Sequence, residues 1–164
     1  MNVEELNAAS EPRLREVLLA CCDAPAFARA VAGGRPYADL DALLDAADAA
    51  ARRLTQAEVD QALAAHPRIG ERAAGERTEQ AWSRQEQAAV LGDGGDRAEL
   101  VQANRDYEER FGRVFLICAT GLRADQVVAA ARERLQHDDE TEQRVVADEL
   151  RKIALLRLRK AVVR

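Results

Sequence analysis

Aromatic residues are scarce in this sequence and make up 4% of its 164 residues. Alanine, leucine and valine must therefore fill the core, and the abundance of Ala, Leu, Arg, Glu and Gln favours helix. A chain of this length normally folds as one domain. The composition predicts an all-α fold over residues 1–164, as a single-domain bundle of about seven to nine helices with one short extended apolar segment.

Clustered positive charge is also lacking. The formal net charge is −5, and no stretch is basic enough for DNA or RNA binding, which disfavours a helix-turn-helix regulator. No apolar run approaches the roughly 20 residues that span a bilayer. Glycine-rich phosphate-binding motifs are missing, and the two histidines lie in unrelated contexts. We therefore expect no nucleic-acid partner, no membrane insertion, no nucleotide and no metal ion.

Cysteine is rare, with Cys21, Cys22 and Cys118 as its three occurrences. An odd number that includes two adjacent residues suits a reducing compartment, and Cys21 and Cys22 are interpreted as core residues. The start of the chain does not resemble a secretion signal, and the end carries no peroxisomal tripeptide. These features predict a cytoplasmic protein.

Capping and breaking residues divide the chain into helices. Ser10 followed by Pro12, Asp39, and Thr55 paired with Glu58 are start signals. The expected helices cover residues 10–22, 25–33, 39–54, 55–66, 78–91, 96–112, 125–136 and 140–159, with a loop over 67–77. The one continuous apolar run, residues 114–118, is too short to distinguish a strand from a buried extended segment.

Arg157 interrupts an apolar helical stripe. Val146, Leu150, Ile153 and Arg157 follow one another at spacings of four, three and four, so Arg157 lies where Ile or Leu is expected. A buried guanidinium needs an anion, which either a protein carboxylate or a substrate carboxylate can supply. The pattern alone favours a structural Arg–Glu pair or an arginine that reaches solvent.

The helix expected over residues 78–91 carries polar groups next to its apolar face. Glu86 shares a face with Trp82, and Ser83 and Gln87 lie on the adjoining edge. Together they offer a carboxylate, a hydroxyl and an amide, which suit a heterocycle with urea-like groups. The pattern alone favours a solvated polar flank with Trp82 packed inward.

His66 stands between a helix and a proline-led loop, which restricts its backbone. With an ordinary pKa near 6.5, a histidine is the natural proton donor at neutral pH. A histidine at a helix end is more often a cap or a surface residue. His137 lies in a polar loop, and we expect it to be exposed.

Five ordered blocks of the sequence carry motifs that can be compared with those of known families. Residues 65–71 are similar to an HPR-[IL]-G signature, and residues 83–87 to an S-x-x-E-Q motif. Residues 104–118 resemble an N-x₂-Y-x₂-[KR]-F-G block, and residues 134–158 a closing R-L…E…E-[IL]-x₂-I-x₃-R pattern. In this order, the blocks resemble those of the OHCU decarboxylases, which convert 2-oxo-4-hydroxy-4-carboxy-5-ureidoimidazoline (OHCU) to (S)-allantoin. Leu6-Asn7 and Arg35-Pro36-Tyr37 match that family in kind. The chain departs from the family at Pro25-Ala26-Phe27, where a tryptophan is frequent, and at Arg113, where an aromatic is common.

The resemblance implies an all-helical fold, usually a homodimer, that acts on a small ureidoimidazoline without a metal or organic cofactor. It implies that His66 donates the proton and that Glu86 and Arg157 are its catalytic companions. It places the substrate contacts at Pro67, Ser83, Arg84, Gln85, Glu86, Gln87, Phe115, Leu116, Ile117, Cys118 and Ala119.

Two other functions stay open at this point. One is a non-catalytic helical interaction module, in which Arg157 pairs with an internal carboxylate. The other is a lyase that acts on a related ureide. The decarboxylase is favoured because Glu86 and Arg157, which the helical pattern places on apolar faces, are two of the three catalytic residues that the resemblance implies.

Overall fold

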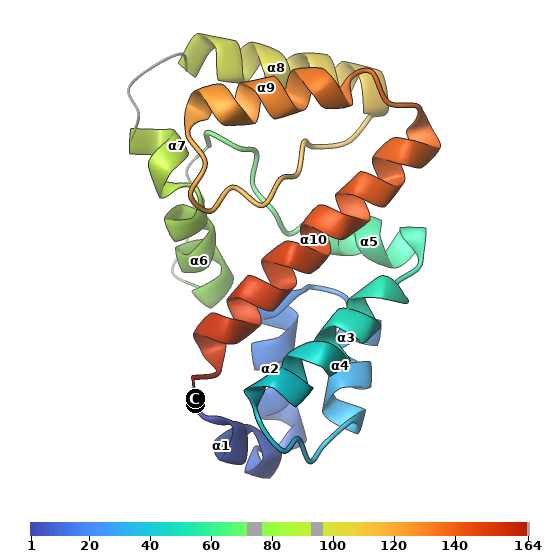
Figure 1. Ribbon diagram of the computed structural model, residues 1–164, viewed down its shortest axis with the longest axis vertical. Helices are drawn as coiled ribbons and strands as arrows, with labels where there is room; N and C mark the ends of the chain where they lie inside the picture. Colours follow the sequence, from blue (N-terminus) through green and yellow to red (C-terminus); the bar gives the residue numbers. More distant parts are fainter. Residues whose placement is uncertain (72–76, 93–96, 164) are drawn as a thin grey trace. The chain divides into compact units, whose positions relative to one another are not determined.

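A computed structural model of the chain describes residues 1–71, 77–92 and 97–163, and its regular structure consists of ten α-helices within these ranges (Figure 1). The predicted all-α class is therefore confirmed. The residues form two compact units, the first made of Met1–Ala65 and Leu150–Arg164 and the second of His66–Glu149. A single domain over the whole chain stays a prediction. None of the described helices is long and apolar enough to cross a membrane.

The first unit contains α1 (Val3–Ala8), α2 (Glu11–Cys21), α3 (Pro25–Gly33), α4 (Leu40–Arg52), α5 (Gln56–Leu63) and the end of α10 (Asp139–Ala161). Helix α3 packs against both α2 and α4 (Figure 1). As the composition predicts, aliphatic side chains such as Leu6, Leu14, Leu18, Leu43 and Ala47 fill this core, together with the buried aromatic residues Phe27 and Tyr37.

The predicted helix starts in this unit are confirmed. Asp39 Oδ1 accepts a hydrogen bond from Ala42 N at 2.8 Å, and Thr55 and Glu58 form the expected reciprocal capping box. Ser10 occupies the position before α2, although its side chain makes no capping bond. Helix α1 was not predicted, but Asn2 and Glu5 form a capping box that marks its start.

Two short motifs that match the family in kind meet in the first unit. Asn7 Oδ1 accepts from Tyr37 N at 2.9 Å, and Asn7 Nδ2 donates to Tyr37 O at 2.8 Å. The Arg35 guanidinium donates to Ala9 O at 2.8 Å, and the Arg35–Pro36 peptide bond is cis. Asn7 thereby satisfies the backbone of a turn that has no helical partner.

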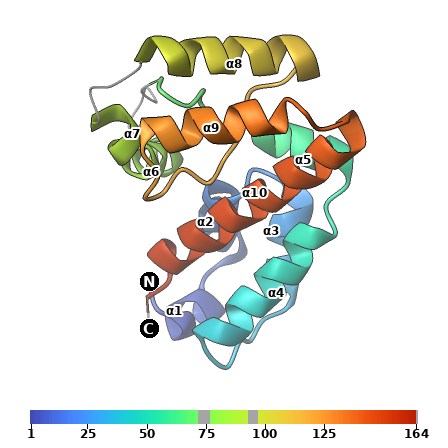
Figure 2. The same ribbon diagram turned by 45° about the horizontal axis from the view of Figure 1, so that its top comes forward.

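The second unit contains α6 (Thr78–Glu86), α7 (Ala88–Gly92), α8 (Arg97–Phe111), α9 (Ala124–Arg134) and the start of α10. Helices α8 and α9 lie side by side, and α7 packs against α9 (Figure 2). The core of this unit includes Ile69, Leu100, Tyr107, Phe111, Phe115 and Val127.

The single helix predicted over residues 78–91 is wrong, because the structure divides it at Gln87 into α6 and α7. Gln87 leaves the helical conformation, with φ −95° and ψ 5°, and its side chain binds the backbone of Gly70. No glycine or proline marks this break in the sequence. The expected start of the next helix at residue 96 lies outside the described residues.

Residues 114–119 form neither helix nor strand, which answers the question that the apolar run left open. Gly112 ends α8 in the left-handed region at φ 68°, as expected for a glycine after a helix. Phe115, Leu116 and Ala119 are nevertheless buried. This irregular backbone needs hydrogen-bond partners from elsewhere in the second unit.

Candidate active site

The loop that follows His66 is fixed by side chains of the second unit. His66 and Pro67 are half-buried. Asn104 Nδ2 of α8 donates to Ile69 O at 2.8 Å, and Gly70 N donates to Gln87 Oε1 at 3.0 Å. Because φ of Gly70 is +91° and an added Cβ would lie 2.7 Å from a Leu100 methyl carbon, the loop requires glycine here.

Arg68 adds an ion pair to the outer side of this loop. Its Nε lies 2.5 Å from Glu108 Oε1 and its Nη2 lies 3.1 Å from Glu108 Oε2. The hydrogen bond to Glu108, followed by the charge of that carboxylate, raises the pKa of Arg68. This two-point pairing orients the backbone next to His66 and Pro67.

The polar edge of α6 is buried, so a solvated flank does not describe it. Ser83, Glu86 and the following Gln87 are 5%, 8% and 5% exposed. Ser83 Oγ donates to Glu79 O at 2.9 Å within the helix. Arg84 is half-buried and Gln85 is exposed. A hydroxyl, a carboxylate and an amide are thus collected where apolar side chains would be expected.

The irregular segment 115–119 is held at two backbone points. Arg134 Nη1 donates to Leu116 O at 2.6 Å, and Cys118 N donates to Glu149 Oε2 at 2.8 Å. The Cys118 amide is thereby engaged within the protein. Among the described residues we find no acceptor for the amides of Ile117 and Ala119.

Arg134 belongs to a buried polar cluster that was not predicted. Glu142 is 0% exposed, and its Oε1 accepts from Tyr107 Oη at 2.5 Å and from Arg134 Nε at 2.8 Å. Its Oε2 lies 2.9 Å from His137 Nδ1. The expectation of an exposed His137 is therefore wrong, since its side chain is 26% exposed and has a carboxylate partner.

Opposing effects set the protonation of this cluster. Burial by itself raises the pKa of Glu142, but hydrogen bonds from Arg134, Tyr107 and His137 outweigh burial, and the net shift is downward. Burial, followed by the hydrogen bond to Glu142, raises the pKa of Tyr107. Glu142 is therefore an anion and Tyr107 a neutral donor. The sequence did contain a signal, because Glu142 precedes Val146 by four residues on the stripe that leads to Arg157.

Arg157 lies in the first unit, and its predicted place on a buried face is confirmed, since it is 3% exposed. Its Nη1 donates to Ala20 O at 3.3 Å, in the last turn of α2, where the helix dipole places partial negative charge. Cys22 is close enough for the Arg157 charge to act on it. Burial, and then Asp23, still raise the pKa of the Cys22 thiol to about 12, which agrees with a core cysteine rather than a nucleophile.

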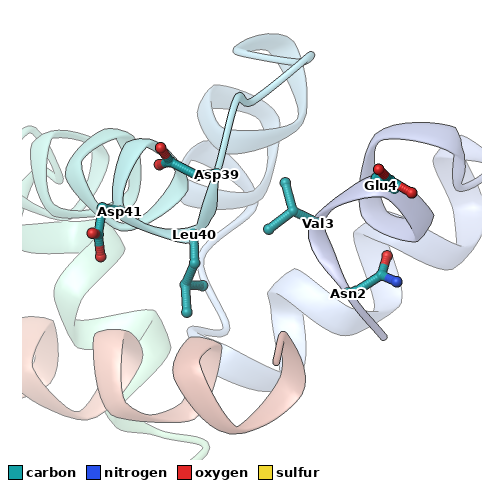
Figure 3. A pocket seen from close by; sticks show the side chains of 6 residues that line it. All are labelled: Asn2, Val3, Glu4, Asp39, Leu40 and Asp41. Carbon is teal, nitrogen blue, oxygen red and sulfur yellow. The ribbon is translucent and has the colours of Figure 1, made fainter. Parts of the chain in front are cut away.

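One cavity of the first unit is lined by none of these residues. A cavity of about 560 Å³ in the first unit is lined by Asn2, Val3, Glu4, Asp39, Leu40 and Asp41 (Figure 3). Val3 of α1 faces the start of α4, where Leu40 lies, and three carboxylates surround them. Such a lining disfavours an anionic substrate. Among the described residues no cluster of three or more His, Cys, Asp or Glu could hold a metal ion.

The second unit thus combines an HPRIG loop held by side chains, a buried polar helix edge and an irregular apolar segment. The family model of OHCU decarboxylase matches residues 7–159. The chain belongs to the OHCU decarboxylase family.

Individual relatives agree with this assignment. The chain is 34% identical over 137 residues to the 2-oxo-4-hydroxy-4-carboxy-5-ureidoimidazoline decarboxylase of Haloferax volcanii. The match covers 82% of this chain and 79% of the relative. It is 33% identical over 137 residues to the enzyme of that name from Mus musculus, covering 82% and 77%. A crystal structure of an OHCU decarboxylase in the presence of (S)-allantoin matches with a TM-score of 0.75 and 25% identity, covering 89% of this chain and 96% of the other.

Proposed function

We propose that this chain decarboxylates OHCU to (S)-allantoin in the breakdown of uric acid. Its family and the names of its relatives support the substrate. The observation that carries the proposal is the hydrogen bond of 3.0 Å from Gly70 N to Gln87 Oε1. It joins the loop after His66 to the buried Ser83–Gln87 edge, so that two sequence motifs meet within the second unit.

The substrate itself provides the electron sink for the reaction. Its carboxylate is attached to a carbon that also carries a hydroxyl and adjoins a ring carbon able to accept electrons. When the bond to the carboxylate breaks, CO₂ leaves and the electron pair moves into the ring as an enolate-like intermediate. A proton must then be delivered to one face of the neighbouring ring carbon, which carries the ureido group, while the hydroxyl loses its proton and its carbon becomes a carbonyl. The protein therefore has to orient the carboxylate, stabilise the developing charge and hold a donor.

His66 is assigned as that proton donor, and solvent returns the proton to its ring after each turnover. Glu86 orients the His66 ring or binds the substrate hydroxyl. Arg157 supplies positive charge for the substrate carboxylate or the developing oxyanion. The substrate contacts proposed beside them are Pro67, Ser83, Arg84, Gln85, Gln87, Phe115, Leu116, Ile117, Cys118 and Ala119. Ser83 Oγ, which donates to Glu79 O, can still accept a hydrogen bond, and Gln87, whose Oε1 accepts from Gly70 N, can still donate through Nε2, which suits the ureido and ring polar groups.

The test generates OHCU from urate with the two upstream enzymes and measures CO₂ release and substrate loss against the spontaneous rate. The proposal predicts that the chain accelerates both. A panel of other ureides separates the decarboxylase from a lyase of a related compound. Acceleration with another ureide but not with OHCU would reject the assignment, and no acceleration with any of them would favour a non-catalytic module.

We also propose that the chain is cytoplasmic and forms a homodimer. The odd number of cysteines, of which Cys21 and Cys22 are adjacent and buried, supports a reducing compartment. The dimer is supported by the resemblance alone. Light scattering coupled to size-exclusion chromatography checks it, and a monomeric mass at micromolar concentration would contradict it.

A further inference from the structure

Arg134 links the buried cluster to the irregular segment through one planar group. Its Nε and Nη2 both donate to Glu142 Oε1, at 2.8 and 2.5 Å, and its Nη1 donates to Leu116 O at 2.6 Å. The guanidinium carbon also lies 4.6 Å from the centre of the Phe115 ring. Because the five donors of a guanidinium have fixed directions, Glu142 determines where Nη1 points.

Tyr107 and His137 hold the carboxylate that directs Arg134. The Tyr107 hydroxyl donates to the same Glu142 oxygen at 2.5 Å, and His137 Nδ1 lies 2.9 Å from the other oxygen. Glu142 and the Arg134 side chain are 0% and 7% exposed. Buried ion pairs of this kind often contribute little net stability compared with apolar side chains. Stability alone is therefore a weak explanation for the cluster, whereas control of backbone direction is a specific one.

The peptide unit between Leu116 and Ile117 transmits this control. In a trans peptide the C=O and the following N–H point in opposite directions. By holding Leu116 O, Arg134 therefore turns the Ile117 N–H away from the cluster. Glu149, which accepts from Cys118 N at 2.8 Å, likewise turns the Ile117 C=O away from itself. Ile117 thus presents one donor and one acceptor, the complement of an H–N–C=O edge in a urea-like ring.

We propose that Arg134 is a positioning residue for the decarboxylation: held by Glu142 and Tyr107, it fixes the Leu116 carbonyl and thereby aims the Ile117 backbone at the substrate. This inference rests on the proposed function, which makes segment 115–119 a substrate contact. Arg134 acts through the Leu116 carbonyl and does not contact the substrate itself. Its loss should therefore weaken substrate binding while leaving the chemistry of proton donation unchanged.

The first test compares Arg134→Lys with two controls. Lysine keeps the charge but concentrates its donors on one atom, so it fails to hold Glu142 and Leu116 O together. We expect KM for OHCU to rise about tenfold, which corresponds to the loss of about one hydrogen bond. The value of kcat should stay within about threefold of wild type, and its pH profile should be unchanged. Arg132→Lys, at an exposed α9 arginine paired with Glu99, controls for the exchange of side chains. Val127→Ala, at a fully buried residue of α9, controls for lost stability.

The second test needs no turnover. Amide hydrogen exchange of peptides containing residues 114–119 should speed up in Arg134→Lys and stay near wild type in Arg132→Lys and Val127→Ala, at a temperature where all are folded. Should Arg134→Lys not fold, Tyr107→Phe provides a milder loss of the same network. Unchanged exchange, or faster exchange with an unchanged KM, overturns the positioning role. An inactive wild type rejects the proposed function instead, and hydrogen exchange still shows whether Arg134 fixes the segment.

Discussion

The two units differ in where they place buried polar side chains. Among the described residues, the first unit has one buried polar or charged residue, Arg157. The second unit has six: Ser83, Glu86, Gln87, Asn104, Arg134 and Glu142. The first unit is built from helices joined by short connections, so its backbone mostly satisfies itself. The second unit contains two irregular stretches, after His66 and after Gly112.

Several buried polar side chains of the second unit bind its irregular backbone. Backbone N–H and C=O groups outside helices need partners, and side chains supply them. Gln87 and Asn104 serve the first stretch, and Arg134 and Glu149 the second. In the first unit, the Asn7 side chain likewise binds the backbone of the turn at Tyr37. The second unit is thus the part suited to present fixed polar groups to a ligand.

The largest effect should come from His66→Asn, which removes the proposed proton donor of the second unit. The rate of enzymatic (S)-allantoin formation should fall by about 10²–10⁴-fold, the usual contribution of a general acid. Far-ultraviolet circular dichroism should show the wild-type helical content. In His66→Ala, added imidazole should restore part of the rate. A fully active Asn variant would reject the donor assignment.

A substitution at Arg157 tests whether the first unit supplies a catalytic group. Arg157→Lys should lower kcat/KM by about 100-fold, because lysine does not reproduce the guanidinium fork. Arg151→Lys, in the same helix and unit, is the matched control, since Arg151 pairs with Asp48 at 2.5 Å. It should retain kcat/KM within about twofold. Equal losses in the two variants would reduce Arg157 to a structural role.

Gly70 and Gly112 of the second unit both have positive φ, so the effect of an added methyl group can be compared between them. Gly70→Ala combines a left-handed backbone with a methyl 2.7 Å from Leu100, whereas an added Cβ at Gly112 meets nothing within 4 Å. In urea unfolding we expect Gly70→Ala to cost about 2–3 kcal/mol and Gly112→Ala about 1 kcal/mol. Equal costs would mean that the loop after His66 adapts to the extra methyl.

Acid should weaken the second unit through Glu142. Because the pKa of Glu142 is lower in the folded chain than in the unfolded one, its contribution is complete above about pH 4.3 and is lost as the pH falls through the folded value. Glu142→Gln should therefore show a smaller loss of unfolding free energy between neutral pH and pH 3 than wild type does. Asp125→Asn is the control, because solvent screens the exposed Asp125–Arg123 pair that lowers the pKa of Asp125. An equal acid loss in wild type and Glu142→Gln would contradict this cause.

Local signals in the sequence predicted the fold better than the site. Caps such as Asp39 and Thr55 act within four residues, so they located helix starts correctly. The break at Gln87 depends on Gly70, which is 17 residues away, and no local signal records such a bond. The partner of His137 depends in the same way on how its loop meets α10. Arg157 was visible as a misplaced charge on a stripe, and extending that stripe by one turn would have revealed Glu142.

The handedness of the allantoin produced tests the central claim most directly. OHCU is formed in place from urate, and circular dichroism follows the product with and without this chain. The account predicts a signal of the (S) enantiomer that grows faster than spontaneous decay of OHCU allows. Racemic product at the spontaneous rate, from correctly folded protein, would contradict it.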